Sequence, residues 1–139
     1  MNVYADSSFL VSLYLRDSHT PDALRLIAHR PRIWLTALHE AELAHAVAQQ
    51  VFRRQISAEV ANRTSLKIAQ NRHVWVITSF PDGSFEKAIE LAQAHVAQFG
   101  TRTLDSLHVA SALKLNAHEF WTFDERQAKL AKAAGLKVR

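Results

Sequence analysis

The chain has 139 residues, of which 48% are apolar and 22% are charged, a composition typical of globular proteins and not of disordered ones. Cysteine is absent, which excludes disulfides and thiolate metal sites and favours a reducing, cytoplasmic setting. No apolar run reaches the roughly 18 residues of a membrane span, and the first residues lack a secretory signal pattern. We therefore expect one domain over residues 1–139, in the cytoplasm, without a membrane partner.

The net charge is +4 with the eight histidines neutral, a mild excess that suits either a polyanionic partner or simply a basic surface. The basic side chains are unevenly placed, because several of them gather within residues 53–72. They are Arg53, Arg54, Arg63, Lys67 and Arg72. A positive flank of this kind would suit an RNA backbone that leads to a metal-bound phosphate.

In chain order, the first part of the sequence alternates apolar runs with helical patterns. Short apolar runs predict buried strands over residues 2–5 and 32–35. Apolar residues at helical spacing predict helices over residues 8–16, 20–29 and 36–55. The second of these helices has the clearest start signal, because Thr20 can cap it and Pro21 suits its first position.

The rest of the chain continues the alternation. Helical patterns cover residues 58–71, 85–99, 103–116 and 125–134. β-branched and aromatic runs predict strands over residues 74–78 and 119–123, with a last edge strand at 136–138. Strands that alternate with helices form a mostly parallel sheet covered on both faces. We therefore expect an α/β protein with three layers, α/β/α, around a central sheet of four to five strands.

Four acidic residues mark the places where strands end or helices begin. Asp6 and Asp124 each follow directly on a predicted strand. Asp105 lies in the first turn of a predicted helix, and Glu42 lies early in another. Such positions converge at the carboxyl edge of a parallel sheet. Converging carboxylates repel one another unless a cation lies between them, and Mg²⁺ or Mn²⁺ is the cation that prefers oxygen ligands.

Each acid also has a purely structural explanation. Asp6 and Asp124 can cap the helices that follow them, and the residues after Asp124 have the form of a capping box. Asp105 suits the positive end of a helix dipole, although Thr103 can cap that helix by itself. Glu42 is the hardest to explain structurally, because it lies in an apolar stretch of its helix.

Together, the four acids predict a metal-dependent phosphodiesterase. One metal ion, or two ions about 3.5–4 Å apart, would lower the pKa of a bound water and stabilise the leaving oxygen. Three hydroxyl side chains near the acids can orient the carboxylates or their waters, namely Ser7, Ser8 and Thr122. The sequence does not distinguish one metal ion from two.

Four segments carry motifs in an order that resembles a known family. They are residues 3–11 (VYADSSFLV), 35–43 (LTALHEAEL), 102–112 (RTLDSLHVASA) and 120–127 (FWTFDERQ). The segments resemble the successive acidic motifs of PIN domains, and of VapC-type toxins in particular. The resemblance spans the whole chain. Two positions depart from the family pattern, because Ser7 stands where threonine is usual and His45 where asparagine is expected.

The resemblance implies a PIN-like fold and a Mg²⁺- or Mn²⁺-dependent endoribonuclease. The four acids Asp6, Glu42, Asp105 and Asp124 would be the catalytic metal ligands. Cleavage would leave a 5′-phosphate and a 3′-hydroxyl. The resemblance also implies the toxin of a type II toxin–antitoxin pair, silenced by a cognate antitoxin protein that covers the acidic groove, and a homodimer.

Three further features allow two interpretations each. Arg53 lies eleven residues beyond Glu42, so both should face the same way on one helix. Arg53 and Arg54 would then contact RNA phosphates, or else simply form a solvated helix end. His45 and His108 each lie three residues after a proposed ligand, which suits proton shuttles, but packing or local bonding is the favoured interpretation.

Two rival functions come from other classes. A haloacid-dehalogenase-like phosphatase or a receiver-like phosphoacceptor also places an aspartate after the first strand. The phosphatase needs a second aspartate two residues on, where this chain has Ser8, and neither the central aspartate nor the late lysine of a receiver is present. The other rival is a PIN fold that binds RNA or protein without cleaving, and retention of all four acids argues against it.

Overall fold

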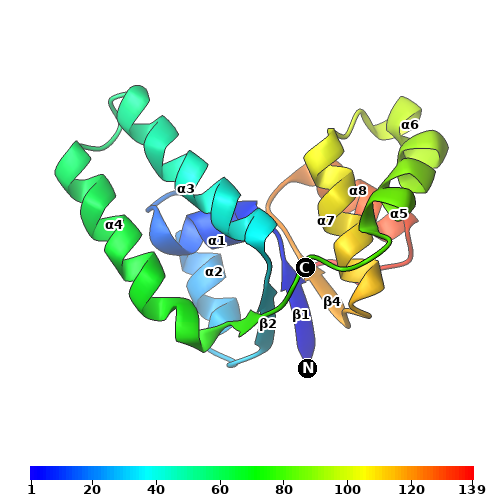
Figure 1. Ribbon diagram of the computed structural model, residues 1–139, viewed down its shortest axis with the longest axis horizontal. Helices are drawn as coiled ribbons and strands as arrows, with labels where there is room; N and C mark the ends of the chain where they lie inside the picture. Colours follow the sequence, from blue (N-terminus) through cyan, green and yellow to red (C-terminus); the bar gives the residue numbers. More distant parts are fainter.

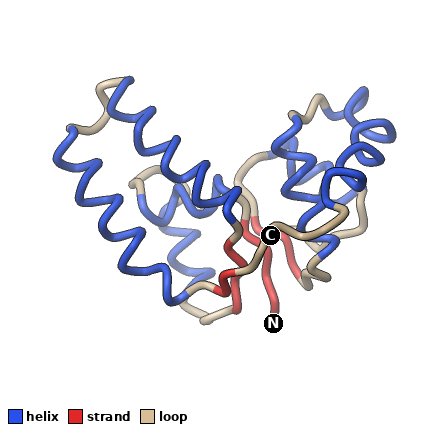
Figure 2. The backbone as a smooth tube through the Cα atoms, viewed as in Figure 1, coloured by secondary structure: helices blue, strands red, loops and turns tan.

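The computed structural model describes residues 1–139 and is built around a four-stranded parallel sheet. The strands are β1 (Asn2–Ala5), β2 (Arg32–Leu35), β3 (Val76–Ile77) and β4 (Glu119–Trp121). Their order across the sheet is β3-β2-β1-β4, and every neighbouring pair is parallel. Figure 2 shows the strands at the centre of the molecule with helices on either side. The predicted α/β class and parallel sheet are therefore confirmed.

The helices form two groups that flank the sheet (Figure 1). One group contains α1 (Ser7–Tyr14), α2 (Thr20–Ile27), α3 (Ala37–Phe52) and α4 (Ala58–Gln70). The other contains α5 (Ser84–Leu91), α6 (Ala97–Phe99), α7 (Thr103–Lys114) and α8 (Glu125–Ala133). Short 3₁₀ and π segments complete the chain, η1 (Asn71–Val74) and η2 (Ala92–Val96). None of the helices combines the length and apolar character that crossing a membrane requires.

Several predicted boundaries differ from the structure for local reasons. The strand expected at 74–78 shortens to Val76–Ile77, because a 3₁₀ turn occupies the residues before it. The helix expected at 85–99 contains a π turn at Ala92–Val96, which changes the direction in which side chains point. Ala92, the first residue of this turn, is exposed. The strand expected at 136–138 is reduced to one bridge, between Phe120 and Val138.

The core lies on both faces of the sheet because strand side chains alternate. Val3, Ala5 and Trp121 pack on the side of α1 and α2. Tyr4 and Phe120 point the other way and pack against α7 and α8. Of the three tryptophans, Trp121 is fully buried, whereas Trp34 and Trp75 are half-buried. This packing fixes the ends of β1 and β4 relative to the helices that begin there.

A buried histidine joins the end of β1 to the start of α3. The Nδ1 atom of His39 accepts the backbone N–H of Thr36 at 3.0 Å, and its Nε2 donates to the carbonyl of Ala5 at 2.9 Å. Only the neutral imidazole can make both bonds, since a carbonyl can only accept. Burial, assisted by the charge of His108, lowers the pKa of His39 to about 3.

This low pKa predicts that the fold loses stability in mild acid. In the unfolded chain, histidine binds a proton below about pH 6.5, whereas the folded protein keeps His39 neutral until about pH 3. The free energy of unfolding should therefore fall by about 2 kcal/mol between pH 7 and pH 5. Urea unfolding at both pH values measures this change. The change should be smaller in His39→Gln, and an equally steep loss in that variant would contradict the assignment.

The residues after α8 run beside β4 and hold its end. The N–H of Phe120 donates to the carbonyl of Lys137 at 2.8 Å, and the N–H of Thr122 donates to that of Arg139 at 3.0 Å. The buried side chain of Glu119 pairs with Lys137 at 2.6 Å and with Arg139 at 3.1 Å. Burial raises the pKa of Glu119, but these cations and Trp121 outweigh it and leave the pKa below its usual value. The C-terminal residues thus help to position Thr122.

Candidate metal centre at the carboxyl edge of the sheet

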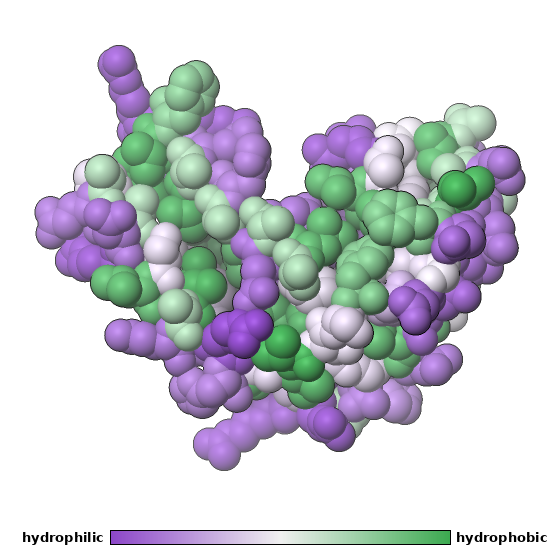
Figure 3. Space-filling view, in the orientation of Figure 1, coloured by the Kyte–Doolittle hydropathy of each residue, from purple (hydrophilic) through white to green (hydrophobic).

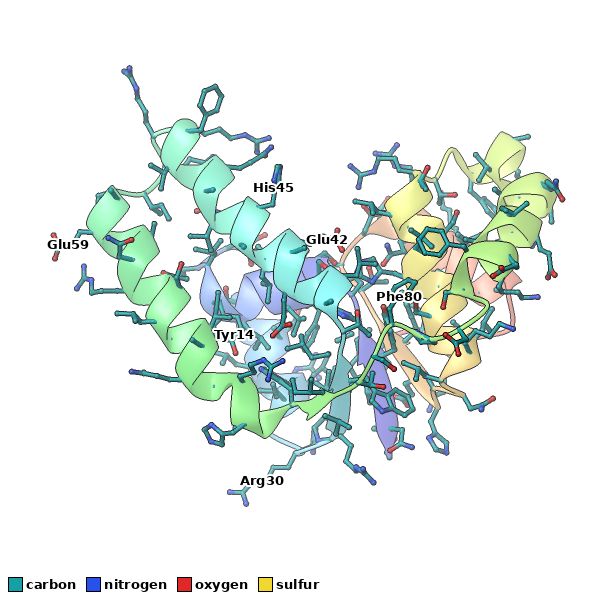
Figure 4. The ribbon with its side chains drawn as sticks, in the orientation of Figure 1. Tyr14, Arg30, Glu42, His45, Glu59 and Phe80 are labelled. Carbon is teal, nitrogen blue, oxygen red and sulfur yellow. The ribbon has the colours of Figure 1, made fainter.

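The four predicted acids line one small polar pocket where the strands end. Asp6 precedes α1, Glu42 lies in the second turn of α3, Asp105 lies in the first turn of α7, and Asp124 precedes α8. The pocket has a volume of about 70 Å³ and no hydrophobic residue in its lining. Its other lining residues are Ser7, Ser8, Arg102, His108 and Gln127. Figure 4 shows Glu42 on the side of α3 that faces α7.

Three of the acids also accept backbone N–H groups at helix starts. The capping explanation is therefore correct for Asp6 and Asp124, and Asp105 makes a capping-box bond at the start of α7. Asp6 accepts the N–H of Phe9 at 3.0 Å, and Asp124 accepts the N–H of Gln127 at 2.9 Å. Asp105 accepts the N–H of Arg102 at 2.8 Å. The expectation that Thr103 caps this helix is wrong, because the helix already includes it. These bonds fix the positions of the acids.

Asp6 is the most deeply buried of the four acids, with only 2% of its surface exposed. Its two carboxylate oxygens accept hydrogen bonds from Ser8 and from Thr122, each at 2.6 Å. Burial raises the pKa of Asp6, although the charge of His108 and the bonds from Ser8 and Thr122 oppose the rise. Burial disfavours the charged form of this carboxylate, and a nearby cation would stabilise that form.

Glu42 is held by a different set of partners. Its Oε1 accepts the hydroxyl of Ser7 at 2.9 Å and contacts Nε2 of His108, whose Nδ1 lies 2.9 Å from the hydroxyl of Tyr4. Desolvation raises the pKa of Glu42. The bonds from His108 and Ser7 and the charge of Arg102 together lower it by more, so the net shift is downward. The favoured local-bonding role of His108 agrees with these contacts.

Besides His108, two residues of the pocket were not among the predicted site residues. Arg102 approaches Asp105 with Nε at 3.4 Å and Asp124 with a terminal nitrogen at 3.8 Å. Gln127 donates from its side-chain amide to the second oxygen of Asp105 at 3.1 Å. An arginine three residues before an acid at a helix start was the available sequence signal for Arg102, whereas nothing local marked Gln127 as a neighbour of Asp105.

The chemistry of the pocket fits a hard divalent cation, but its carboxylates do not form a ready ligand shell. No three Asp, Glu or His side chains lie close enough together to hold one ion. Each carboxylate is engaged by a hydroxyl, His108, Gln127 or Arg102. The donors are nevertheless all oxygen, which is the preference of Mg²⁺ and Mn²⁺, and the polar lining has room for water ligands.

The other predicted residues lie outside this pocket. Arg53 follows the last residue of α3, and Arg54 comes next with a backbone φ of 57°. Both are exposed, and along the helix axis Arg53 is about 16 Å from Glu42. His45 bonds Gln49 at 3.1 Å. The structure thus leaves the two arginines at a distance from the acids that only an extended ligand could span.

A wider groove adjoins the polar pocket, with a volume of about 580 Å³. It lies between α1, α3 and the start of α7, and Figure 3 shows the molecule hollowed between its two halves. Its walls include the apolar side chains Val11, Leu38, Ala41, Ala46 and Leu104. Glu42 and Arg102 line both the groove and the pocket. A ligand in the groove would therefore reach the acids directly.

The fold and the pocket define a class of protein. An α/β fold with acids, supporting hydroxyls and an arginine at the carboxyl edge of a parallel sheet is suited to metal-assisted chemistry on phosphodiesters. The chain matches the PIN domain family over residues 3–133. The protein belongs to the PIN domain family, as the resemblance of the four acidic motifs predicted.

Individual relatives agree with this assignment. The chain is 31% identical over 140 residues to Ribonuclease VapC46 of Mycobacterium tuberculosis, covering 98% of this chain and 95% of that protein. The crystal structure of M. tuberculosis VapC20, a sarcin–ricin loop cleaving toxin, has a TM-score of 0.71 at 19% identity, covering 96% and 95% of the two chains. FitAcB from Neisseria gonorrhoeae has a TM-score of 0.74 at 17% identity, covering 98% and 95%. These structures share the fold.

Proposed function

We propose that this protein is a divalent-metal-dependent endoribonuclease and the toxin of a type II toxin–antitoxin pair. The observation that carries the proposal is the meeting of four acids, from four separate motifs, in one pocket without hydrophobic lining. Membership of the PIN domain family and the 31% identity to Ribonuclease VapC46 support the choice of RNA as substrate. VapBC2 from Rickettsia felis, whose crystal structure has a TM-score of 0.67 with this chain, supports an antitoxin partner.

In this proposal Asp6, Glu42, Asp105 and Asp124 hold Mg²⁺ or Mn²⁺. A bound ion supplies an activated water and neutralises charge on the phosphate. The chain's own residues keep the carboxylates in place. Ser8 and Thr122 orient Asp6, Ser7 and His108 orient Glu42, and Gln127 orients Asp105.

The groove suits flanking nucleotides of a single strand. Its apolar walls can cover the faces of unpaired bases while their phosphates lie toward Glu42 and Arg102. A paired helix hides its base faces, so we propose that cleavage occurs in single-stranded segments or loops. The cognate antitoxin would inhibit by occupying the same groove, and a homodimer would place two such grooves in one particle.

RNA cleavage tests the proposal directly. Purified protein should cut a mixture of single-stranded and structured RNA with Mn²⁺ or Mg²⁺, and EDTA should stop the reaction. The new ends should be 5′-phosphate and 3′-hydroxyl, which end-specific labelling distinguishes. RNA that is bound but never cut, under any of these conditions, would favour the rival binding module.

We propose that Arg53 and Arg54 contact RNA phosphates outside the pocket. Replacing both with alanine should weaken RNA binding in EDTA and reduce the slope of log affinity against log salt by about 1.4, since each single-strand phosphate contact contributes roughly 0.7. Arg30→Ala is the control, because Arg30 is an exposed arginine with a similar positive φ of 49°, and Figure 4 shows it at the opposite end of the molecule from His45. Equal slopes in all three proteins would favour a solvated helix end.

A further inference from the structure

We infer that Arg102 is an exchangeable internal cation, which competes with divalent metal for Asp105 and Asp124 and, once displaced, binds a phosphate of the substrate. The inference rests on the proposed nuclease function and adds to it a specific residue of this chain. In this inference Arg102 weakens the binding of the metal ion and strengthens the binding of the RNA substrate.

The position of the guanidinium supports competition with metal. It lies between two acids that belong to different helices, at 3.4 Å from Asp105 of α7 and 3.8 Å from Asp124 before α8. Arg102 is the one lysine or arginine in the lining of the polar pocket. The hydrogen bond to Asp105 and the charge of Asp105, and then the charges of Asp124 and Glu42, raise the pKa of Arg102, so it interacts with three of the four proposed ligands.

The contacts of Arg102 with Asp105 and Asp124 are also long enough for a metal ion to replace the guanidinium. A tight bond between a guanidinium and a carboxylate is about 2.7–2.9 Å long, and both contacts of Arg102 are longer. The arginine side chain is 69% exposed, whereas that of Asp105 is 8% exposed. The carboxylate is therefore fixed while the guanidinium can leave into solvent without crossing packed side chains.

The side chain of Arg102 also borders two larger spaces beside the polar pocket. It lines the groove of about 580 Å³ and an adjoining hollow of about 310 Å³ that it shares with Glu42, Thr103, Leu104 and Asp105. A substrate phosphate in either space lies within reach of the side chain. The planar guanidinium fork matches two oxygens of a phosphate, which a lysine ammonium does not.

The side chain of Arg102 can be replaced without removing the bond by which this residue helps to start α7. Its backbone N–H, and not its guanidinium, makes the capping bond to Asp105 at the start of α7. Arg102→Gln and Arg102→Lys therefore keep the capping bond and should fold. Glutamine removes the charge, whereas lysine keeps the charge and removes the fork.

The test measures Mn²⁺ binding and RNA kinetics separately. Isothermal titration calorimetry without RNA should show roughly threefold to tenfold tighter Mn²⁺ binding by Arg102→Gln, because a competing positive charge is gone. Arg102→Lys should bind Mn²⁺ about as the wild type does. At saturating Mn²⁺, the KM for RNA should rise roughly tenfold in both variants, because neither can make the bidentate contact. Arg126→Gln, at an exposed position of α8 outside the pocket, should change neither quantity.

Several outcomes would overturn the inference. Unchanged Mn²⁺ affinity in Arg102→Gln would exclude competition, and weaker affinity would mean that Arg102 supports the ligands. Tighter Mn²⁺ binding with an unchanged KM would exclude the phosphate contact. A wild-type protein that binds Mn²⁺ but cuts no RNA would instead contradict the proposed function, and the calorimetric comparison would still test the competition.

Discussion

Asp105→Asn should lower the rate of RNA cleavage by roughly a hundredfold or more while the protein stays folded. Asparagine has nearly the same shape as aspartate and keeps an oxygen to accept the N–H of Arg102, so the start of α7 is preserved. The substitution removes a negative charge from the polar pocket, and with it a ligand suited to a divalent cation. Single-turnover rates at saturating Mn²⁺, compared with circular dichroism of both proteins, measure the two effects.

The matched control is Asp82→Asn, which makes the same chemical change at an exposed turn position. This variant should cleave at the wild-type rate. If Asp105→Asn cleaves as fast as the control, either the activity comes from a contaminating nuclease or Asp105 does not take part in the reaction.

Thr122→Val should weaken Mn²⁺ binding by about tenfold to a hundredfold, the usual cost of losing a side chain that orients a metal ligand. The hydroxyl of Thr122 donates to Asp6 at 2.6 Å and accepts the N–H of Asp124 at 3.0 Å. One hydroxyl therefore positions two of the proposed ligands, Asp6 before α1 and Asp124 before α8. Valine fills nearly the same volume, so the effect isolates the two hydrogen bonds. Calorimetric titration with Mn²⁺ measures the affinity.

Thr101→Val is the corresponding control, because the buried hydroxyl of Thr101 has no hydrogen-bond partner. Its removal should leave Mn²⁺ affinity unchanged and should not reduce the free energy of unfolding. If the two variants bind Mn²⁺ equally well, the hydroxyl of Thr122 does not orient the ligands.

The sequence predicted the features that follow from local pattern. The alternation of apolar runs with helical spacing was enough for the parallel α/β fold, because each element buries a face that its own periodicity defines. The strand ends and the first turns of the helices then located all four acids of the pocket. The start of the strand predicted at 74–78 and the interior of the helix predicted at 85–99 were less predictable. A 3₁₀ turn and a π turn replace regular structure there, and neither has a strong sequence signal.

The contacts that hold the acids could not be predicted in the same way. Tyr4 and His108 are 104 residues apart, and His108 and Glu42 are 66 apart, so no spacing rule connects them. Gln127 looked like part of a helix start, and its amide reaches Asp105 only because α7 and α8 pack side by side. Such contacts depend on tertiary packing, which a single sequence does not specify.

Three of the four acids accept backbone N–H bonds at helix starts, and this affects how related sequences are interpreted. A chain that had lost its catalytic activity during evolution would still gain stability from Asp6, Asp105 and Asp124, because each of them accepts a backbone N–H at the start of a helix. Their presence in a homologue is therefore weak evidence of enzymatic competence. Glu42 caps nothing and accepts bonds only from side chains, so a substitution there is the more informative sign of a pseudoenzyme.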